Sequence, residues 1–159
     1  MPSEHGTSPG RQSGIITYAD PATTVLADAD DLFRENAQQL LTEDGYAVTE
    51  AADGGEALEL LSEMANAHLP LPEVLVMDFV MPRLSGLGVL RALWHVRRLP
   101  PTLLLSDFPD PSVDTIAKRL GVYRVLRKPA DGEDLCAAFR EVSTWPAKRR
   151  RGSRDPRTD

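Results

Sequence analysis

Short apolar runs alternate with amphipathic segments along most of this chain. The apolar runs are typical of strands and cover residues 24–27, 46–49, 73–77, 102–105 and 123–126. After each run, apolar residues recur at the three- and four-residue spacing of a helix. These segments cover residues 32–41, 57–64, 86–96, 113–120 and 135–142. The pattern therefore predicts five strands, each followed by a helix. Gly45 and Gly121 are expected to end two of the helices, and Asp131 to cap the last.

This order of elements favours βαβ units and a parallel sheet. Residues 73–77 and 102–105 are almost entirely apolar, as central strands covered on both faces should be. Right-handed crossovers would place helices on both faces of the sheet. The sequence therefore predicts a doubly wound α/β fold whose strand-to-helix loops all open at one edge.

Length and composition are those of one soluble domain. The 159 residues are 42% hydrophobic and 26% charged, and Cys136 is the single cysteine, so no internal disulfide is expected. No run approaches the roughly 18 apolar residues of a membrane span, and the first residues lack a secretory signal. We therefore expect a cytoplasmic protein.

The two ends of the chain differ from its centre. Residues 1–22 are rich in Ser, Gly, Pro and Thr and are predicted to be a disordered leader. Residues 145–159 hold six of the 18 basic residues and are predicted to be a basic disordered tail. The folded part, residues 23–144, is therefore more acidic than the net charge of −6 suggests, which makes nucleic acid an improbable partner.

Chemically active side chains follow four of the five predicted strands. Asp28 follows the first strand, Asp78 the third, Ser106 and Asp107 the fourth, and Lys128 the fifth. Because the carboxyl ends of parallel strands meet at one edge, these side chains should converge. A carboxylate can attack phosphorus, acidic oxygens can bind Mg²⁺, and a lysine and a hydroxyl can bind phosphoryl oxygens. The set therefore predicts phosphoryl transfer.

In this arrangement the chain resembles the receiver domain of two-component response regulators, over about residues 23–144. The segment Asp-x-x-Met-Pro-x-x-x-Gly at 78–86 is similar to the phosphoacceptor segment of that family. Residues 52–58 resemble the start of its second helix. Ser106 falls at its Ser/Thr position and Lys128-Pro129 at its Lys-Pro pair. The resemblance implies a flavodoxin-like (βα)5 fold with strand order 2-1-3-4-5.

The resemblance also implies a function as a signalling module that is not an enzyme. Asp78 would accept a phosphoryl group from a histidine kinase or a histidine phosphotransfer protein, and Ser106 and Lys128 would bind that group. Mg²⁺ would be held by Asp28, by Asp78 and by the backbone carbonyl of Val80. With no room for an output domain, the chain would signal to a downstream protein through its fourth helix, fifth strand and fifth helix.

Three positions depart from the family pattern. Ala29 stands where the family carries a second acid that binds Mg²⁺, so Mg²⁺ binding should be weaker. Asp107 stands where the family has a small residue, and we consider it as a replacement ligand. Val125 occupies the aromatic switch position, with Tyr123 two residues earlier, so the usual coupling to the output face is in doubt.

Two further functions are compatible with these residues. The departures favour a degenerate receiver that binds partners without being phosphorylated. Asp28-x-Asp30 after an apolar strand also matches the nucleophile motif of haloacid-dehalogenase-type phosphatases. That remote alternative leaves the segment at Asp78 unexplained, and it lacks a later pair of adjacent acids for Mg²⁺.

Overall fold

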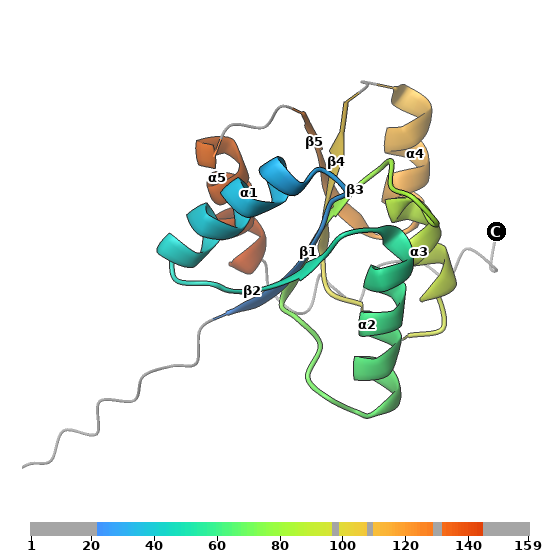
Figure 1. The fold of residues 1–159 in the computed structure, drawn as a ribbon. Coiled ribbons are helices and arrows are strands. Elements are labelled where there is room, and N and C mark those ends of the chain that lie inside the picture. Colours follow the sequence, from blue (N-terminus) through green and yellow to red (C-terminus); the bar gives the residue numbers. More distant parts are fainter. Residues whose placement is uncertain (1–21, 97–98, 108–109, 129–131, 145–159) are drawn as a thin grey trace, which may run out of the picture.

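The computed structural model describes residues 22–96, 99–107, 110–128 and 132–144, which form a parallel sheet with helices on both faces (Figure 1). The strands are β1 (Thr23–Ala27), β2 (Ala47–Ala51), β3 (Val74–Asp78), β4 (Thr102–Ser106) and β5 (Val122–Arg127). Their order is β2-β1-β3-β4-β5, with all pairs parallel. The predicted flavodoxin-like fold is thereby confirmed. The predicted leader apart from Ala22, the predicted tail, Pro129 and Asp131 lie outside the described residues.

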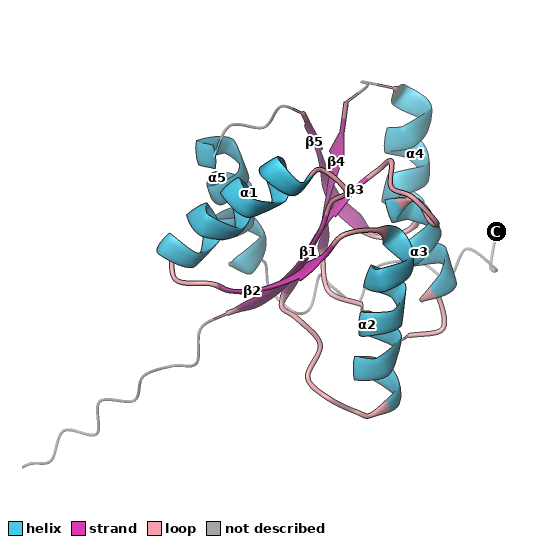
Figure 2. Cartoon of the chain, viewed as in Figure 1, coloured by secondary structure: helices cyan, strands magenta, loops and turns pink. Residues whose placement is uncertain are grey.

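In the described part of the chain, five helices cover the sheet, two on one face and three on the other (Figure 2). One face carries α1 (Asp31–Glu43) and α5 (Gly132–Ser143). The other carries α2 (Gly54–Asn66), α3 (Gly86–Ala92) and α4 (Pro111–Arg119). Within the described residues, no helix is long and apolar enough to cross a membrane.

Each face of the sheet has its own hydrophobic core. Successive residues of β3 alternate between them, because strand side chains point to opposite faces. Leu75 and Met77 pack with α2, α3 and α4, whereas Val74 and Val76 pack with α1 and α5. All five residues of β3 and of β4 are buried. The nearly continuous apolar composition of these strands follows from coverage on both faces.

Polar caps begin four of the five helices. In each case a side-chain oxygen accepts a backbone N–H of the first turn; the capping residues are Asp30, Asp53, Ser85 and Asp110. Such a bond satisfies one of the N–H groups that a helix leaves without a partner. Each cap lies in the loop that joins a strand end to the next helix, and three of these loops begin at strand ends of the candidate site.

The third helix is shorter than predicted. It ends at Ala92, whereas the apolar pattern continues to Val96. Leu93 and Val96 still pack against the core, but they belong to a turn in which Trp94 N–H donates to the Arg91 carbonyl. The apolar spacing therefore identified correctly which residues pack against the core. It could not show where the helix ends and the turn begins.

Two apolar residues of the first predicted helix are more exposed than expected. Leu32 is 68% exposed and Leu40 is 37% exposed, although both fitted the apolar pattern. Ala37 and Leu41 are the buried residues of that helix. The buried stripe of α1 is thus narrower than the pattern predicted.

Candidate functional site

The predicted site residues lie where β1, β3, β4 and β5 end, at one edge of the sheet (Figure 1). Asp28 follows β1, Asp78 is the last residue of β3, Ser106 is the last of β4, and Lys128 follows β5. Asp28, Asp78 and Ser106 are all buried. The edge is therefore polar yet largely closed to water, which strengthens interactions between charges.

Lys128 joins the two acids of this edge. Its Nζ lies 2.6 Å from Oδ2 of Asp28 and donates a hydrogen bond of 3.2 Å to Oδ2 of Asp78. Its backbone N–H donates to the carbonyl of Ser106 at 2.8 Å, which fixes where the side chain leaves the backbone. Three residues that are far apart in sequence thus form one charged cluster.

Burial and charge shift the pKa values of this cluster. Burial raises the pKa of Asp78 above its ordinary value, the charge of Asp28 adds to the rise, and Lys128 opposes it. Burial alone would lower the pKa of Lys128, but Asp28 and Asp78 outweigh it and the pKa is raised. Lys128 therefore stays cationic, and Asp78 is a more basic carboxylate than an exposed one.

Close backbone packing holds the chain directly after Asp78. Phe79 N–H donates to the Leu105 carbonyl at 2.7 Å, and Gly86 N–H donates to the Phe79 carbonyl at 3.1 Å. A Cβ atom at Gly86 would lie 2.6 Å from the carbonyl oxygen of Asp78. A glycine is required there because this backbone approach leaves no room for a side chain.

Arg83, in the loop after Asp78, forms ion pairs with residues of α2 and its N-cap. It adopts a left-handed backbone with φ of 67°. Its guanidinium pairs with Asp53, the N-cap of α2, at 2.9 Å, and with Glu59 at 3.4 Å. Cβ atoms at Gly54 and Gly55 would meet the loop at under 3 Å. The loop and the start of α2 are therefore packed against each other.

The acids of the edge can hold a divalent cation with two carboxylates. Oδ2 of Asp28 is buried and, beyond its ion pair with Lys128, has no hydrogen-bond partner among the described residues. It lies close to Oδ2 of Asp78, since Nζ of Lys128 contacts both. Mg²⁺ is often held by one or two carboxylates together with water. The donor set therefore fits Mg²⁺.

A third acidic ligand is not in place. In the part of the chain that the structure describes, no three His, Cys, Asp or Glu side chains gather closely enough to hold a metal ion. Asp107 is exposed at the end of β4, and Ala29 is exposed beside Asp28. The side chain of Asp107 is thus not gathered with Asp28 and Asp78.

Comparison with known proteins identifies a family for this chain. The family model of the response regulator receiver domain matches residues 24–140, which include all four residues of the edge. The chain belongs to the response regulator receiver domain family. Receivers of two-component systems carry a phosphoaspartate, bind Mg²⁺ at an acidic pocket, and act with histidine kinases or phosphotransfer proteins and downstream effectors.

Similar proteins include regulators and isolated receivers. The transcriptional regulatory protein PdtaR of Mycobacterium tuberculosis is 31% identical over 142 residues, which is 82% of this chain and 66% of PdtaR. The response regulator MprA of a Mycobacterium species is 34% identical over 77% of this chain and 50% of its own length. The chain thus spans between half and two thirds of these curated relatives.

Solved structures of receivers share the fold. The signal receiver domain of NarL from Mycobacterium tuberculosis matches with a TM-score of 0.70 and 28% identity, over 80% of this chain and 100% of that domain. A receiver domain protein from Clostridium thermocellum matches with a TM-score of 0.67 and 27% identity, over 77% of this chain and 94% of that protein.

In this receiver Asp30 does not replace the acid missing at Ala29. Its side chain is turned to solvent and accepts the N–H of Phe33 at 3.1 Å, as the N-cap of α1. Its backbone N–H donates to Oδ1 of Asp28 at 2.8 Å. Asp30 therefore orients Asp28 and caps a helix. The second acid of the dehalogenase-type motif is thus engaged as a helix cap, which does not favour that alternative.

A bulge separates Tyr123 from the switch position. Thr102 of β4 pairs with Val122 of β5, and the next residue, Leu103, pairs with Arg124. Tyr123 is therefore an extra residue on β5, as in a β-bulge. Val125 then packs with the core of α2, α3 and α4, whereas Tyr123 packs with that of α1 and α5. The Tyr123 hydroxyl donates to Glu141 of α5 at 2.8 Å. In this structure Tyr123 does not stand in for an aromatic residue at position 125.

Sequence reasoning missed two residues of α1 that contact the site. Nζ of Lys128 lies 4.5 Å from the ring centroid of Phe33. Nη1 of Arg34 donates to the backbone carbonyl of Asp28 at 2.7 Å. The apolar pattern included Phe33 only as a core residue of the predicted helix over 32–41. Their position in the first turns after Asp28 is the signal that could have found them.

Proposed function

We propose that residues 23–144 form a single receiver that takes a phosphoryl group on Asp78 and signals by contact with other proteins. The donor would be a histidine kinase or a histidine phosphotransfer protein. The observation that carries the proposal is the pairing of one lysine with two buried carboxylates at the carboxyl edge of the sheet. With two carboxylates and one ammonium the cluster is net negative, so an anionic phosphoryl group would enter it together with Mg²⁺.

Each residue of the edge has a defined part in the proposed transfer. An oxygen of Asp78 attacks phosphorus, the bond from phosphorus to the donor histidine nitrogen breaks, and that nitrogen keeps the electron pair. Lys128, freed from the carboxylate, binds one phosphoryl oxygen, and Ser106 donates to another. Asp28, Asp78 and the carbonyl of Val80 are the proposed ligands of Mg²⁺. Bound Mg²⁺ would supply positive charge to the phosphoryl oxygens.

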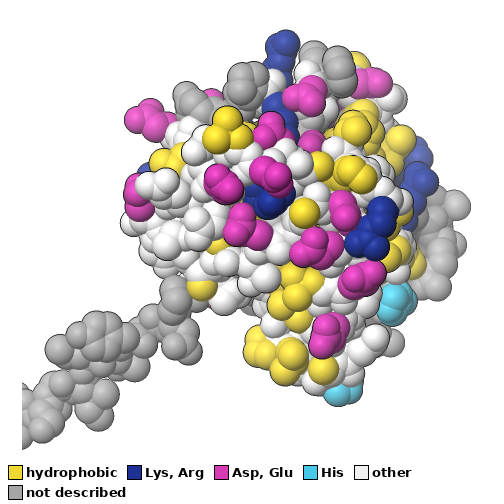
Figure 3. Space-filling view, in the orientation of Figure 1, with side chains coloured by type: hydrophobic (Ala, Val, Ile, Leu, Met, Phe, Trp, Pro, Cys, Tyr) yellow, Lys and Arg dark blue, Asp and Glu magenta, His cyan; other side chains and the backbone are white. Residues whose placement is uncertain are grey.

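The proposed output is a protein surface formed by α4, β5 and α5. PdtaR is named a transcriptional regulatory protein, and this chain spans 66% of its length. Acidic side chains spread across one face of the molecule, with basic ones between them (Figure 3). These acidic side chains and the net charge of −6 favour protein partners over nucleic acid. We propose that the protein acts in the cytoplasm.

A degenerate receiver is the second candidate, and the exposed Ala29 favours it. Without an acid at that position the described site offers two carboxylates, so Mg²⁺ would bind weakly and phosphorylation would be slow. Such a chain would bind its partners whether or not it were phosphorylated.

One experiment separates the two candidates. The full chain is incubated with Mg²⁺ and acetyl phosphate or phosphoramidate, and its intact mass is measured, with Asp78→Ala as the control. The proposal predicts a gain of one phosphoryl group that Asp78→Ala abolishes. An unchanged mass in the native chain would support the degenerate receiver and sink the proposed function.

A further inference from the structure

Three groups surround the ammonium of Lys128, and one of them is an aromatic ring. The carboxylates of Asp28 and Asp78 lie at 2.6 and 3.2 Å from Nζ, and the Phe33 ring centroid at 4.5 Å. The side chain of Lys128 is only 10% exposed. The cation is therefore largely removed from water, which is where attraction to the face of a ring is strongest.

The ring and the carboxylates hold Lys128 in different ways. A carboxylate pairs with the ammonium in a defined direction, and Asp78 would lose its free charge when it is phosphorylated. The ring face attracts a cation without neutralising it and without requiring a single direction. Phe33 can thus keep the ammonium beside the site while its anionic partner changes from a carboxylate to a phosphoryl oxygen.

We propose that Phe33 is a positioning residue, which holds Lys128 at the carboxyl edge so that it can bind the incoming phosphoryl group. This inference rests on the proposed function, because it assigns Lys128 its role in the transfer. Phe33 does not touch the reacting atoms and acts only through Lys128. It comes from the first turn of α1, on a different element from either acid.

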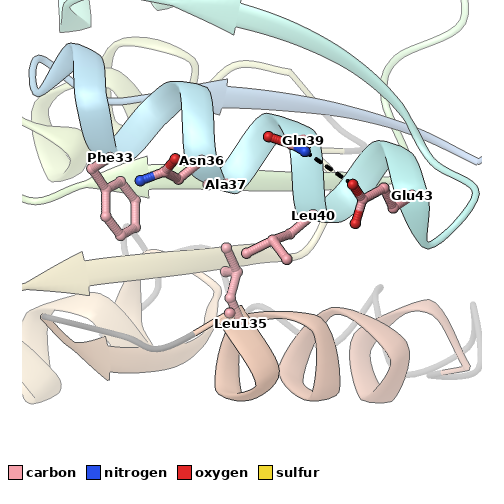
Figure 4. Close-up of a pocket in the computed structure, with 8 residues that line it drawn as sticks. Phe33, Asn36, Ala37, Gln39, Leu40, Glu43 and Leu135 are labelled. Carbon is pink, nitrogen blue, oxygen red and sulfur yellow. Dashed lines mark hydrogen bonds between the residues drawn. The ribbon is translucent and has the colours of Figure 1, made fainter.

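Phe33 also lines a cavity between α1 and α5, which makes its substitution informative. The cavity measures about 410 Å³, and its wall includes Leu40 and Leu135 (Figure 4). In the close-up Phe33 and Leu40 point from α1 toward the space beside α5. A half-buried ring at a cavity wall loses less packing on substitution than an enclosed ring does. Phe33→Leu therefore tests the ring more than it tests the core.

The test compares four forms of the full chain: native, Phe33→Leu, Phe33→Tyr and Leu40→Ala. Phe33→Tyr keeps an aromatic face, and Leu40→Ala alters the same cavity without touching Lys128. The first readout is the proton NMR signal of the Lys128 ε-methylene, assigned by its absence in Lys128→Gln and recorded without phosphodonor. A ring face shifts this signal upfield, so the shift should be present in the native chain, Phe33→Tyr and Leu40→Ala and lost in Phe33→Leu.

The second readout is the rate at which Asp78 is phosphorylated by acetyl phosphate with Mg²⁺. Phe33→Leu should lower that rate roughly threefold to tenfold, the size of a partly buried cation–ring contact, with Phe33→Tyr and Leu40→Ala close to the native chain. A native Lys128 signal without an upfield shift overturns the inference, as does a native rate in Phe33→Leu. If no form is phosphorylated, the proposed function and the role of Phe33 in transfer both fail, and the NMR shift still decides whether Phe33 holds Lys128.

Discussion

At the scale of single residues, the site depends on what burial does to charge. Asp28 is fully buried, and Lys128 neutralises it from 2.6 Å. Asp107, in contrast, is exposed and lies outside any cluster of three acids in the described structure. A buried carboxylate interacts with a cation far more strongly than an exposed one, whose field is screened by water.

This difference predicts the effect of each acid on Mg²⁺ binding. Asp28→Asn should lower the affinity for Mg²⁺ by about tenfold or more, because it removes a proposed ligand. Asp107→Ala should lower it by roughly twofold to fivefold, as expected for a screened charge. Titration calorimetry of both variants measures this. If Asp107→Ala binds Mg²⁺ as tightly as the native chain or more tightly, Asp107 does not contribute to Mg²⁺ binding. An equal loss of affinity in the two variants would contradict the larger role of Asp28.

A second residue-scale prediction concerns the backbone behind Asp78. Gly86→Ala would place Cβ 2.6 Å from the Asp78 carbonyl oxygen, so it should lower the free energy of unfolding by about 1–3 kcal/mol. Gly88→Ala in the same helix would meet the side chains of Leu84 and Ser85, which can shift more easily than backbone, and should cost less than about 1 kcal/mol. Urea denaturation of both variants tests this, and equal losses would argue against the close approach.

At the scale of elements, polar contacts fix how α1 and α5 lie together. Asp44, the C-cap of α1, pairs with Arg140 of α5 through two contacts of 2.6 and 3.0 Å. The hydrogen bond from Arg140 lowers the pKa of the Asp44 carboxyl below its ordinary value. Burial opposes this shift, and the charge of Arg140 adds to it. The two helices thus share an ion pair across the face opposite α2, α3 and α4.

The lowered pKa gives this ion pair a defined pH dependence. The unfolded chain binds a proton at Asp44 at a higher pH than the folded one. The stabilisation is therefore present above the unfolded pKa of about 3.9 and is lost as the pH falls through the folded value. Asp44→Asn should be less stable than the native chain at pH 7, and the difference should shrink below pH 4. Chemical denaturation at several pH values, with Arg140→Gln as a matched variant, checks it. A difference that does not change with pH would contradict the ion pair.

At the scale of the whole molecule, the sequence predicted the architecture well because burial patterns determine it. The apolar composition of the central strands indicated a parallel sheet covered on both faces. The resemblance carried by the Asp78 segment, Ser106 and Lys128 implied the strand order and the family that comparison confirmed. Local detail was less accessible. Packing between elements determines three features that the apolar periodicity of one sequence does not show. They are the end of α3, the exposure of Leu32 and the bulge at Tyr123.

The sequence likewise predicted which residues meet at the site, but not all of the contacts around them. Asp28, Asp78, Ser106 and Lys128 were found because strand ends converge in a parallel sheet. The contacts of Phe33 and Arg34 with this edge were missed, since they depend on which way α1 turns its first residues. The residues proposed to react follow from topology, whereas the residues proposed to position them follow from packing.

The location of the phosphoryl group tests the account most directly. After incubation with acetyl phosphate and Mg²⁺, reduction by borohydride converts a phosphoaspartate to homoserine, which peptide mass spectrometry can locate. The account predicts homoserine at position 78 and at no other aspartate, with none when the phosphodonor is omitted. Homoserine at position 28 or 107, or none at position 78, would contradict it.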